Sequence, residues 1–258
     1  MTSNKYFFYN AKKIPIDKFF SNVLYDKKIG YYSSRTPFGV KGDFLTSPTI
    51  SNLFSEIIGI WLISSWVTMG KPKKFNIVEL GPGDGSLTKV LLKTFEKFPE
   101  FKIAVNIFLY EKSNLLKNIQ KKNIDNKQVK WINNFSHLKK GPVIFFGNEF
   151  FDAIPIKQFY RNQGVLFQKY YSLEKDKNII EIYKKASSKD KLKIEKFKTL
   201  KNLRFIEFPK LGLDELNKIL KKISLLSGGL LLIDYGYLKN NSKNTLQSVI
   251  NHKKNNLL

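Results

Sequence analysis

The spacing of the apolar residues predicts two helices before the first strand of the chain. Apolar side chains recur every three or four positions over residues 16–24 and again from Ile50 to Trp61, which places them on one face of a helix. The segment between them, "IGYYSSRTPFGVKGDFLTSP", is rich in glycine and aromatic residues and predicts a loop. We therefore expect residues 1–70 to form an N-terminal helical segment that packs on a core formed by residues 71–258.

Beyond residue 70, strand and helix patterns alternate along the chain. The expected elements are a strand at 75–80, a helix at 86–98, a strand at 102–111, a helix at 113–122, strands at 129–132 and 141–150, a helix at 213–226 and a strand at 228–237. Alternation of this kind predicts an α/β fold with a doubly wound, mostly parallel sheet and right-handed crossovers.

Residues 157–208 interrupt the alternation. Apolar and polar residues form strand patterns there, separated by the turns "NQG" and "KDKN", and the lysine-rich stretch 186–201 reads as an exposed connection. We therefore expect an antiparallel insertion at about 157–208 within the larger domain.

The charge of the chain changes this picture little. The formal net charge is +24, which is typical of proteins that bind nucleic acid or anionic membranes. Nearly all of the basic residues are lysines, however, since arginine occurs only at Arg35, Arg161 and Arg204, and the lysines are spread along the whole sequence. Proteins that recognise nucleic acids rely on bidentate contacts from arginine side chains and concentrate their basic residues on one helix or strand. We therefore expect no specific nucleic-acid partner.

Composition and hydropathy exclude several other kinds of site. The chain has no cysteine, and its only histidines are His137 and His252, so we expect no disulfide, no thiolate nucleophile and no metal site. The most apolar stretch, residues 57–70, is too short to span a bilayer, and the first 20 residues contain no continuous apolar run. These features predict a soluble cytoplasmic protein of a bacterium, without membrane insertion.

The turn "VELGPGDGSL", residues 78–87, gives the strongest chemical signal. A strand, a glycine-rich turn and a helix direct backbone N–H groups and the positive end of a helix dipole to one place. A P-loop needs a lysine after the last glycine, and the dinucleotide-binding motif needs a glycine at the position of Ser86. Because Ser86 follows Gly85, the turn matches neither motif. The spacing of Gly81, Gly83 and Gly85 is typical of S-adenosylmethionine-dependent methyltransferases, although an ordinary strand-to-helix turn without a ligand also accommodates it.

Two acidic residues near this turn fit the same ligand. Glu79 precedes the glycines, where a carboxylate would repel a pyrophosphate but attract the cationic amino group of a methionine moiety. Glu111 ends the next strand, where a carboxylate can accept hydrogen bonds from both ribose hydroxyls. This second role is common to dinucleotide and adenosylmethionine folds, and a solvated helix start explains Glu111 equally well.

Candidate catalytic residues follow another buried strand, in "GNEFFDAIP", residues 147–155. Open α/β sheets bind ligands at the carboxyl ends of their strands. Glu149 and Asp152 are close enough in sequence to present two carboxylates to a cationic acceptor such as a guanidinium, and Asn148 can hydrogen-bond the cofactor or the acceptor. Alternatively, these acids cap the turn or helix that follows.

Two further segments contain candidate ligand-binding residues. The loop "KGDFLTSP" offers Asp43 and Thr46 ahead of a helix, and "IDYGY" places Asp234 and Tyr235 at another strand end. A plain helix cap explains the first segment equally well.

Several segments together resemble one family, the MidA-like class I methyltransferases. The segments that carry the resemblance, in family order, are "GYYSSRTPFGVKGDFLTSPTISNLFSEIIGIW", "VELGPGDGSLTKVLL", "GNEFFDAIPIKQF", "GGLLLIDYGY" and "TLQSVINH". The resemblance covers about residues 29–252. The sequence departs from the family pattern at Asp84, where members often have an arginine, and it ends where members continue through further strands, so we expect a C-terminally incomplete member.

The resemblance implies a Rossmann-like methyltransferase fold that uses S-adenosyl-L-methionine. Carried over by motif, Gly81, Gly83 and Gly85 would hold the methionine part and Glu111 the ribose, while the candidates at 148–152 would face the acceptor or cofactor. It also implies a protein arginine acceptor, in the family's mitochondrial branch an arginine of a respiratory complex I subunit. Two alternatives stay open, namely a cofactor-binding assembly or scaffold protein without turnover and, with less support, an NAD(P)-dependent reductase.

Overall fold

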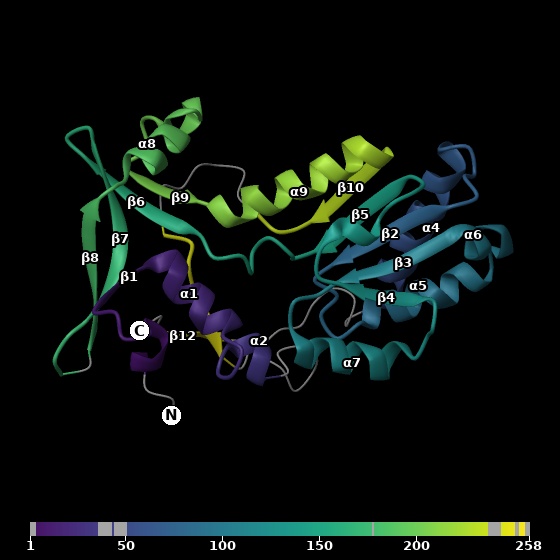
Figure 1. Cartoon of the computed structure of the whole chain (residues 1–258), viewed down its shortest axis with the longest axis horizontal. Coiled ribbons are helices and arrows are strands. Elements are labelled where there is room, and N and C mark those ends of the chain that lie inside the picture. The colour runs from purple at the N-terminus through teal and green to yellow at the C-terminus, as the bar shows by residue number, and fades with distance from the viewer. Residues whose placement is uncertain are drawn as a thin grey trace.

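The computed structural model describes residues 4–35, 43, 51–176, 178–236, 244–250 and 253–255 (Figure 1). A five-stranded sheet of order β10-β5-β2-β3-β4, parallel throughout, forms its centre. The strands are β2 (Phe75–Leu80), β3 (Val105–Tyr110), β4 (Val129–Ile132), β5 (Val143–Asn148) and β10 (Gly228–Ile233). All six residues of β2 are buried, as a central strand covered on both faces requires. The predicted fold class is confirmed.

Helices cover both faces of this parallel sheet. They are α4 (Asn52–Thr68), α5 (Ser86–Glu96), α6 (Pro99–Ala104), α7 (Asn114–Ile124) and α9 (Lys210–Leu226). Side chains that alternate along the strands separate into two cores, one beneath α4, α5 and α6 and one beneath α9. The helical stripe of α5 buries Leu91 and Phe95 completely in the first core. Each such side chain contributes about 2 kcal/mol through apolar burial.

A second sheet is antiparallel and lies at the other end of the molecule (Figure 1). Its strands are β1 (Lys13–Pro15), β6 (Lys157–Asn162), β7 (Val165–Leu173), β8 (Ile179–Lys185) and β9 (Phe205–Phe208). Four of them come from the predicted insertion, but β1 comes from the N-terminal segment and pairs with β7. The N-terminal segment is therefore tied to this sheet by a strand that the sequence pattern did not predict.

The two N-terminal helices α1 (Ile16–Tyr25) and α2 (Tyr31–Ser34) lie between the two sheets (Figure 1). Phe19 of α1 packs edge-on against Tyr171 of β7, with ring centroids 4.9 Å apart, in a small core of its own. Near the C-terminus, β11 (Ser248–Ile250) pairs antiparallel with β12 (Lys253–Asn255). The N-terminal helices therefore bridge the antiparallel sheet and the domain that carries the glycine turn.

Three sequence predictions were wrong in detail. The loop predicted between the first two helices contains helix α2, Tyr31–Ser34. Residues 102–104 belong to helix α6 rather than to the following strand, and Pro99 at the first helical position starts that helix. The stretch 186–201 is not a bare connection, because it contains α8 (Ser188–Glu195), whose Ile194 is fully buried in the core beneath β6 and β9. A single buried apolar residue among many lysines gives too weak a helical pattern to predict.

Candidate functional site

The carboxyl ends of the parallel strands open into a cavity of about 710 Å³. The glycine turn after β2, Glu111 after β3, the loop 148–154 after β5 and Tyr235 after β10 line it on the sheet side. Helices α1 and α2 and the segment 246–248 line the other side. This is where open α/β sheets bind their ligands, and it brings together segments that are far apart in the sequence.

The glycine turn needs its glycines mainly for packing against the protein itself. Gly81 has a φ of +63°, and a Cβ there would lie 2.9 Å from the ring of Phe150. Gly85 has a φ of +87° and caps α5, and a Cβ there would lie 2.9 Å from Ile124 Cδ1. Asp84, the departure from the family pattern, accepts a hydrogen bond from the backbone N–H of Ser86 at 3.0 Å. This hydrogen bond satisfies the first backbone N–H of α5, just after the N-cap residue Gly85.

Glu79 lines the cavity at the end of β2, although only 4% of its surface is exposed. The hydroxyl of Thr88 donates a hydrogen bond to its carboxyl group. Burial raises the pKa of Glu79 to about 7, against the lowering effect of that hydrogen bond, and the charge of Asp84 raises it further. A nearby cation would restore the charge of this carboxylate.

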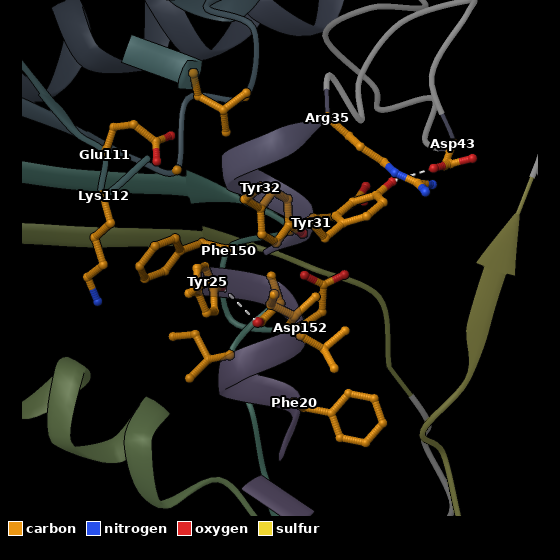
Figure 2. A pocket seen from close by; sticks show the side chains of 18 of the residues that line it. Phe20, Tyr25, Tyr31, Tyr32, Arg35, Asp43, Glu111, Lys112, Phe150 and Asp152 are labelled. Carbon is orange, nitrogen blue, oxygen red and sulfur yellow. Dashed lines mark hydrogen bonds between the residues drawn. The ribbon is translucent and has the colours of Figure 1, made fainter. Parts of the chain in front are cut away.

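Glu111 is 8% exposed and stands at the cavity wall (Figure 2). Its carboxylate accepts the backbone N–H of Ser113 at 2.7 Å and the side-chain amide of Gln120 at 3.2 Å. Burial raises its pKa, and these two hydrogen bonds oppose the rise. The carboxylate is therefore held in one orientation, and its remaining lone pairs can accept hydrogen bonds from a ligand.

Three carboxylates gather at the ends of β5 and β10. The side chain of Asn148 forms a hydrogen bond with Glu149. Burial is the main cause that raises the pKa of Glu149, and the charge of Asp234 raises it further. Tyr235 donates its hydroxyl to Asp152 at 3.1 Å. Burial and, second, the charge of Asp234 raise the pKa of Asp152 to about 6. Like charges this close favour a cationic ligand, which would relieve their repulsion.

The backbone of Glu149 has a φ of +51°, a left-handed conformation that is uncommon for a side chain with a Cβ. Its N–H donates to the carbonyl of Ile233 on the neighbouring strand at 2.8 Å, which holds the turn in place. Strain of this kind costs about 1 kcal/mol or more and tends to occur at functional sites.

Aromatic rings form a wall of the same cavity. Tyr25 and Tyr32 are stacked, with centroids 5.4 Å apart and ring planes 24° from parallel. In Figure 2, Tyr25, Tyr32 and Phe150 stand between Glu111 and Asp152. Burial and then the charges of these two carboxylates raise the pKa of Tyr32, so all three side chains share one electrostatic environment. Sequence patterns gave no sign of Tyr25, because an aromatic residue on an amphipathic helix is ordinarily part of a core.

Two hydrogen bonds fix the N-terminal helices over the cavity. Tyr25 donates its hydroxyl to the carbonyl of Ala153 at 2.9 Å, in the loop after β5. Ser113, which also caps α7, donates its hydroxyl to the carbonyl of Tyr32 at 2.6 Å. Of the two candidates in the loop before α4, Asp43 lines the cavity and accepts the hydroxyl of Tyr31 at 2.6 Å, whereas Thr46 lies outside the described residues.

Within the described part of the chain, no group of three or more histidine, aspartate or glutamate side chains is arranged to hold a metal ion. In the same residues, no helix is long and apolar enough to cross a membrane.

Some known proteins are similar to this chain in sequence, and others are similar to it in fold. Protein arginine methyltransferase NDUFAF7 of Xenopus laevis is 34% identical over 167 residues, which cover 55% of this chain and 38% of the relative. The homologue of Caenorhabditis elegans is 28% identical over 252 residues, covering 87% of this chain and 58% of the relative. The chain therefore spans between about two fifths and three fifths of the length of these relatives.

Among solved structures, a COG1565 superfamily member from Burkholderia thailandensis, bound to S-adenosyl-homocysteine, matches 98% of this chain and 69% of its own. The TM-score is 0.77 at 17% sequence identity, so this likeness concerns the fold. A family model described as "Putative S-adenosyl-L-methionine-dependent methyltransferase" matches residues 57–258, which include the glycine turn and both groups of carboxylates. The chain belongs to this family of S-adenosyl-L-methionine-dependent methyltransferases.

Proposed function

We propose that this chain transfers the methyl group of S-adenosyl-L-methionine to an arginine side chain of a protein. One observation supports this most directly. A single cavity joins the glycine turn and Glu111 to the carboxylates of Glu149 and Asp152, with aromatic rings between them. A donor at the first end and a cationic acceptor at the second would meet in one cavity, where positioning and electrostatics favour reaction.

The residues around the glycine turn fit the cofactor of the family. Glu79 and Glu111 both line the cavity, the first near the turn and the second with lone pairs for ribose hydroxyls. We propose that Glu79 pairs with the amino group of the methionine moiety and that Gly83 leaves the backbone open to it. When bound, the cofactor supplies an electrophilic methyl group on its sulfonium sulfur.

The other end of the cavity fits a guanidinium group. Carboxylates of Glu149 and Asp152 can accept its N–H groups, and the stacked rings of Tyr25 and Tyr32 offer the aromatic surface that arginine prefers. Methylation of a guanidinium nitrogen releases one proton. A carboxyl group with a pKa of about 6, such as that of Asp152, is suited to accept it near neutral pH.

Binding experiments separate this proposal from a nicotinamide-dependent reductase. S-adenosyl-homocysteine should raise the melting temperature of the protein, while NAD at the same concentration should leave it unchanged. Stabilisation by NAD alone would refute the cofactor assignment.

Transfer experiments separate an enzyme from a cofactor-binding assembly protein. Incubation of a cell lysate with the protein and methyl-labelled cofactor should yield a labelled protein band, and mass spectrometry should locate the label on arginine. Asp152→Asn should lower transfer at least tenfold with unchanged S-adenosyl-homocysteine affinity, whereas Glu174→Gln, at an exposed position outside the cavity, should behave like the wild type. Cofactor binding without any labelled protein would favour the assembly role.

The family resemblance also makes a respiratory complex I subunit a candidate acceptor. We propose to include purified complex I from an organism that lacks this protein among the acceptors. Label in one of its subunits would identify the partner, and label in other proteins only would exclude complex I.

A further inference from the structure

Gln120 of α7 lies beside the candidate cofactor site, although it does not line the cavity. Its side chain is completely buried, and it makes three hydrogen bonds to three different elements. The side-chain nitrogen donates to the carbonyl of Gly83 at 2.8 Å and to the carboxylate of Glu111 at 3.2 Å. Both hydrogens of one amide group are therefore used to join the glycine turn to the end of β3.

Trp131 of β4 fixes the orientation of this amide. Its indole N–H donates to the side-chain oxygen of Gln120 at 2.8 Å. If the amide were rotated by half a turn, its NH₂ group would face the indole N–H, and its oxygen would face the carbonyl of Gly83 and the carboxylate of Glu111. An indole nitrogen can only donate, so the rotated amide would lose every hydrogen bond. A single orientation remains.

We propose that Gln120 is a positioning residue that locks the glycine turn to Glu111 and thereby sets the site for the adenosine half of the cofactor. This inference rests on the proposed function, because it assumes that Glu111 accepts the ribose hydroxyls. The carboxylate of Glu111 accepts hydrogen bonds from the backbone N–H groups of Ser113 and Lys112 and from the side chain of Gln120, and Gln120 donates to the oxygen that Ser113 does not hold. Without Gln120, that oxygen would lose its side-chain donor and the turn would lose its link to β3.

The structure supplies a matched control in Asn123, one turn further along α7. Its side-chain amide donates to the carbonyl of Asp84 at 2.9 Å, so it also ties α7 to the glycine turn, but it does not reach Glu111. A variant at this position tests the effect of loosening the turn alone. The difference in ligand affinity between the Gln120 and Asn123 variants measures the contribution of the hydrogen bond to Glu111.

The test measures affinity for S-adenosyl-homocysteine and for 5′-methylthioadenosine, which keeps the adenosine half and lacks the amino acid. Gln120→Leu should weaken both ligands at least about tenfold, since it removes a hydrogen bond to a charged group. Asn123→Ala should weaken them less than about threefold. Circular dichroism and the melting temperature check that the variants fold.

Gln120→Glu distinguishes positioning from packing by its pH profile. The new carboxyl group would lie about as close to Glu111 as the amide does, and two carboxyl groups at that distance share a proton. Affinity of this variant for 5′-methylthioadenosine should be lowest at pH 8 and recover as the pH falls to 5.5. A residue that only fills space would give no such dependence beyond that of the wild type.

Each outcome decides between the interpretations. If Gln120→Leu and Gln120→Glu bind both ligands within twofold of the wild type at every pH, the positioning role is refuted while the proposed function stands. If the wild type itself binds neither ligand, the cofactor assignment fails and the positioning role fails with it. If Gln120→Leu does not fold, the pH profile of Gln120→Glu, which keeps the size and shape of the side chain, decides.

Discussion

Ionisation of Glu79 should set the pH dependence of cofactor binding. Burial raises the pKa of this carboxyl group to about 7, and the cationic amino group of the methionine moiety would pair only with its ionised form. Affinity for S-adenosyl-homocysteine should therefore rise with pH up to about 7 and level off above it. The stability of the ligand-free protein should change in the opposite direction, because ionisation of the buried Glu79 lowers it as the pH rises.

The expected size of both effects follows from the pKa. Its rise from 4.5 to about 7 corresponds to about 3 kcal/mol. Because the folded protein binds this proton more tightly than the unfolded chain, the contribution of Glu79 to stability is fully present below pH 4.5 and is lost as the pH rises through 7. For the ligand, each pH unit below 7 costs up to about tenfold in affinity.

Calorimetric titrations between pH 5.5 and 8 measure this dependence. S-adenosyl-homocysteine carries the amino group and 5′-methylthioadenosine does not, while both carry the ribose that we place at Glu111. The pH dependence contributed by Glu111, whose pKa is also raised, is therefore shared, and the difference between the two profiles reports on Glu79. Glu79→Gln should remove that difference, and in urea denaturation it should remove part of the stability loss between pH 4.5 and 7.

Equal profiles for the two ligands in the wild type would refute the pairing of Glu79 with the amino group. A difference that persists in Glu79→Gln would assign the titration to another residue.

Three further variants test the turn, the strained residue and the aromatic wall. Gly85→Ala should destabilise the protein by about 2 to 3 kcal/mol in urea denaturation, because the new Cβ would contact Ile124 and alanine is strained at this φ. Gly164→Ala, at a φ of +75° with open space around it, should destabilise the protein by only about 1 kcal/mol. Equal losses of stability would mean that the contact with Ile124 has no energetic effect. Glu149→Gly should abolish most methyl transfer while stability stays equal or rises by up to about 1 kcal/mol, since glycine tolerates a φ of +51°, and a clear loss of stability would contradict the strain argument. Tyr25→Phe keeps the ring and loses only the hydroxyl, so it should retain more acceptor affinity than Tyr25→Ala, and equal affinities would exclude stacking.

Long, regular patterns made the parallel sheet predictable from the sequence. The strand at 75–80 was predicted at its observed bounds because a central strand is apolar on both faces and a glycine turn ends it. Elements with few buried residues were not predictable. The three residues of β1 carry no pattern, and α8 buries Ile194 among lysines, so both depend on contacts with distant strands.

The residues that line the cavity were predictable where they belong to a local motif. The glycine turn, Glu111 and the acids at 149–152 all follow strands, and the cavity brings them together. Gln120 could not be found this way, because its partners lie 37 residues before it, 9 before it and 11 after it, and no local pattern marks an amide on a helix. Its role follows only from the geometry of three elements that meet in space.

The hydrogen bond from Tyr25 to Ala153 has a consequence for how acceptor choice can change among related proteins. Helices α1 and α2 supply Tyr25 and Tyr32 at the end of the cavity that we propose for the acceptor, while the ends of the parallel strands supply the glycine turn and Glu111. Under the proposed function, replacement of the N-terminal helices would redirect methyl transfer to a new protein without changing the residues proposed to hold the methyl donor. A chimera that exchanges only residues before 57 with those of a relative should exchange the acceptor and retain the cofactor affinity.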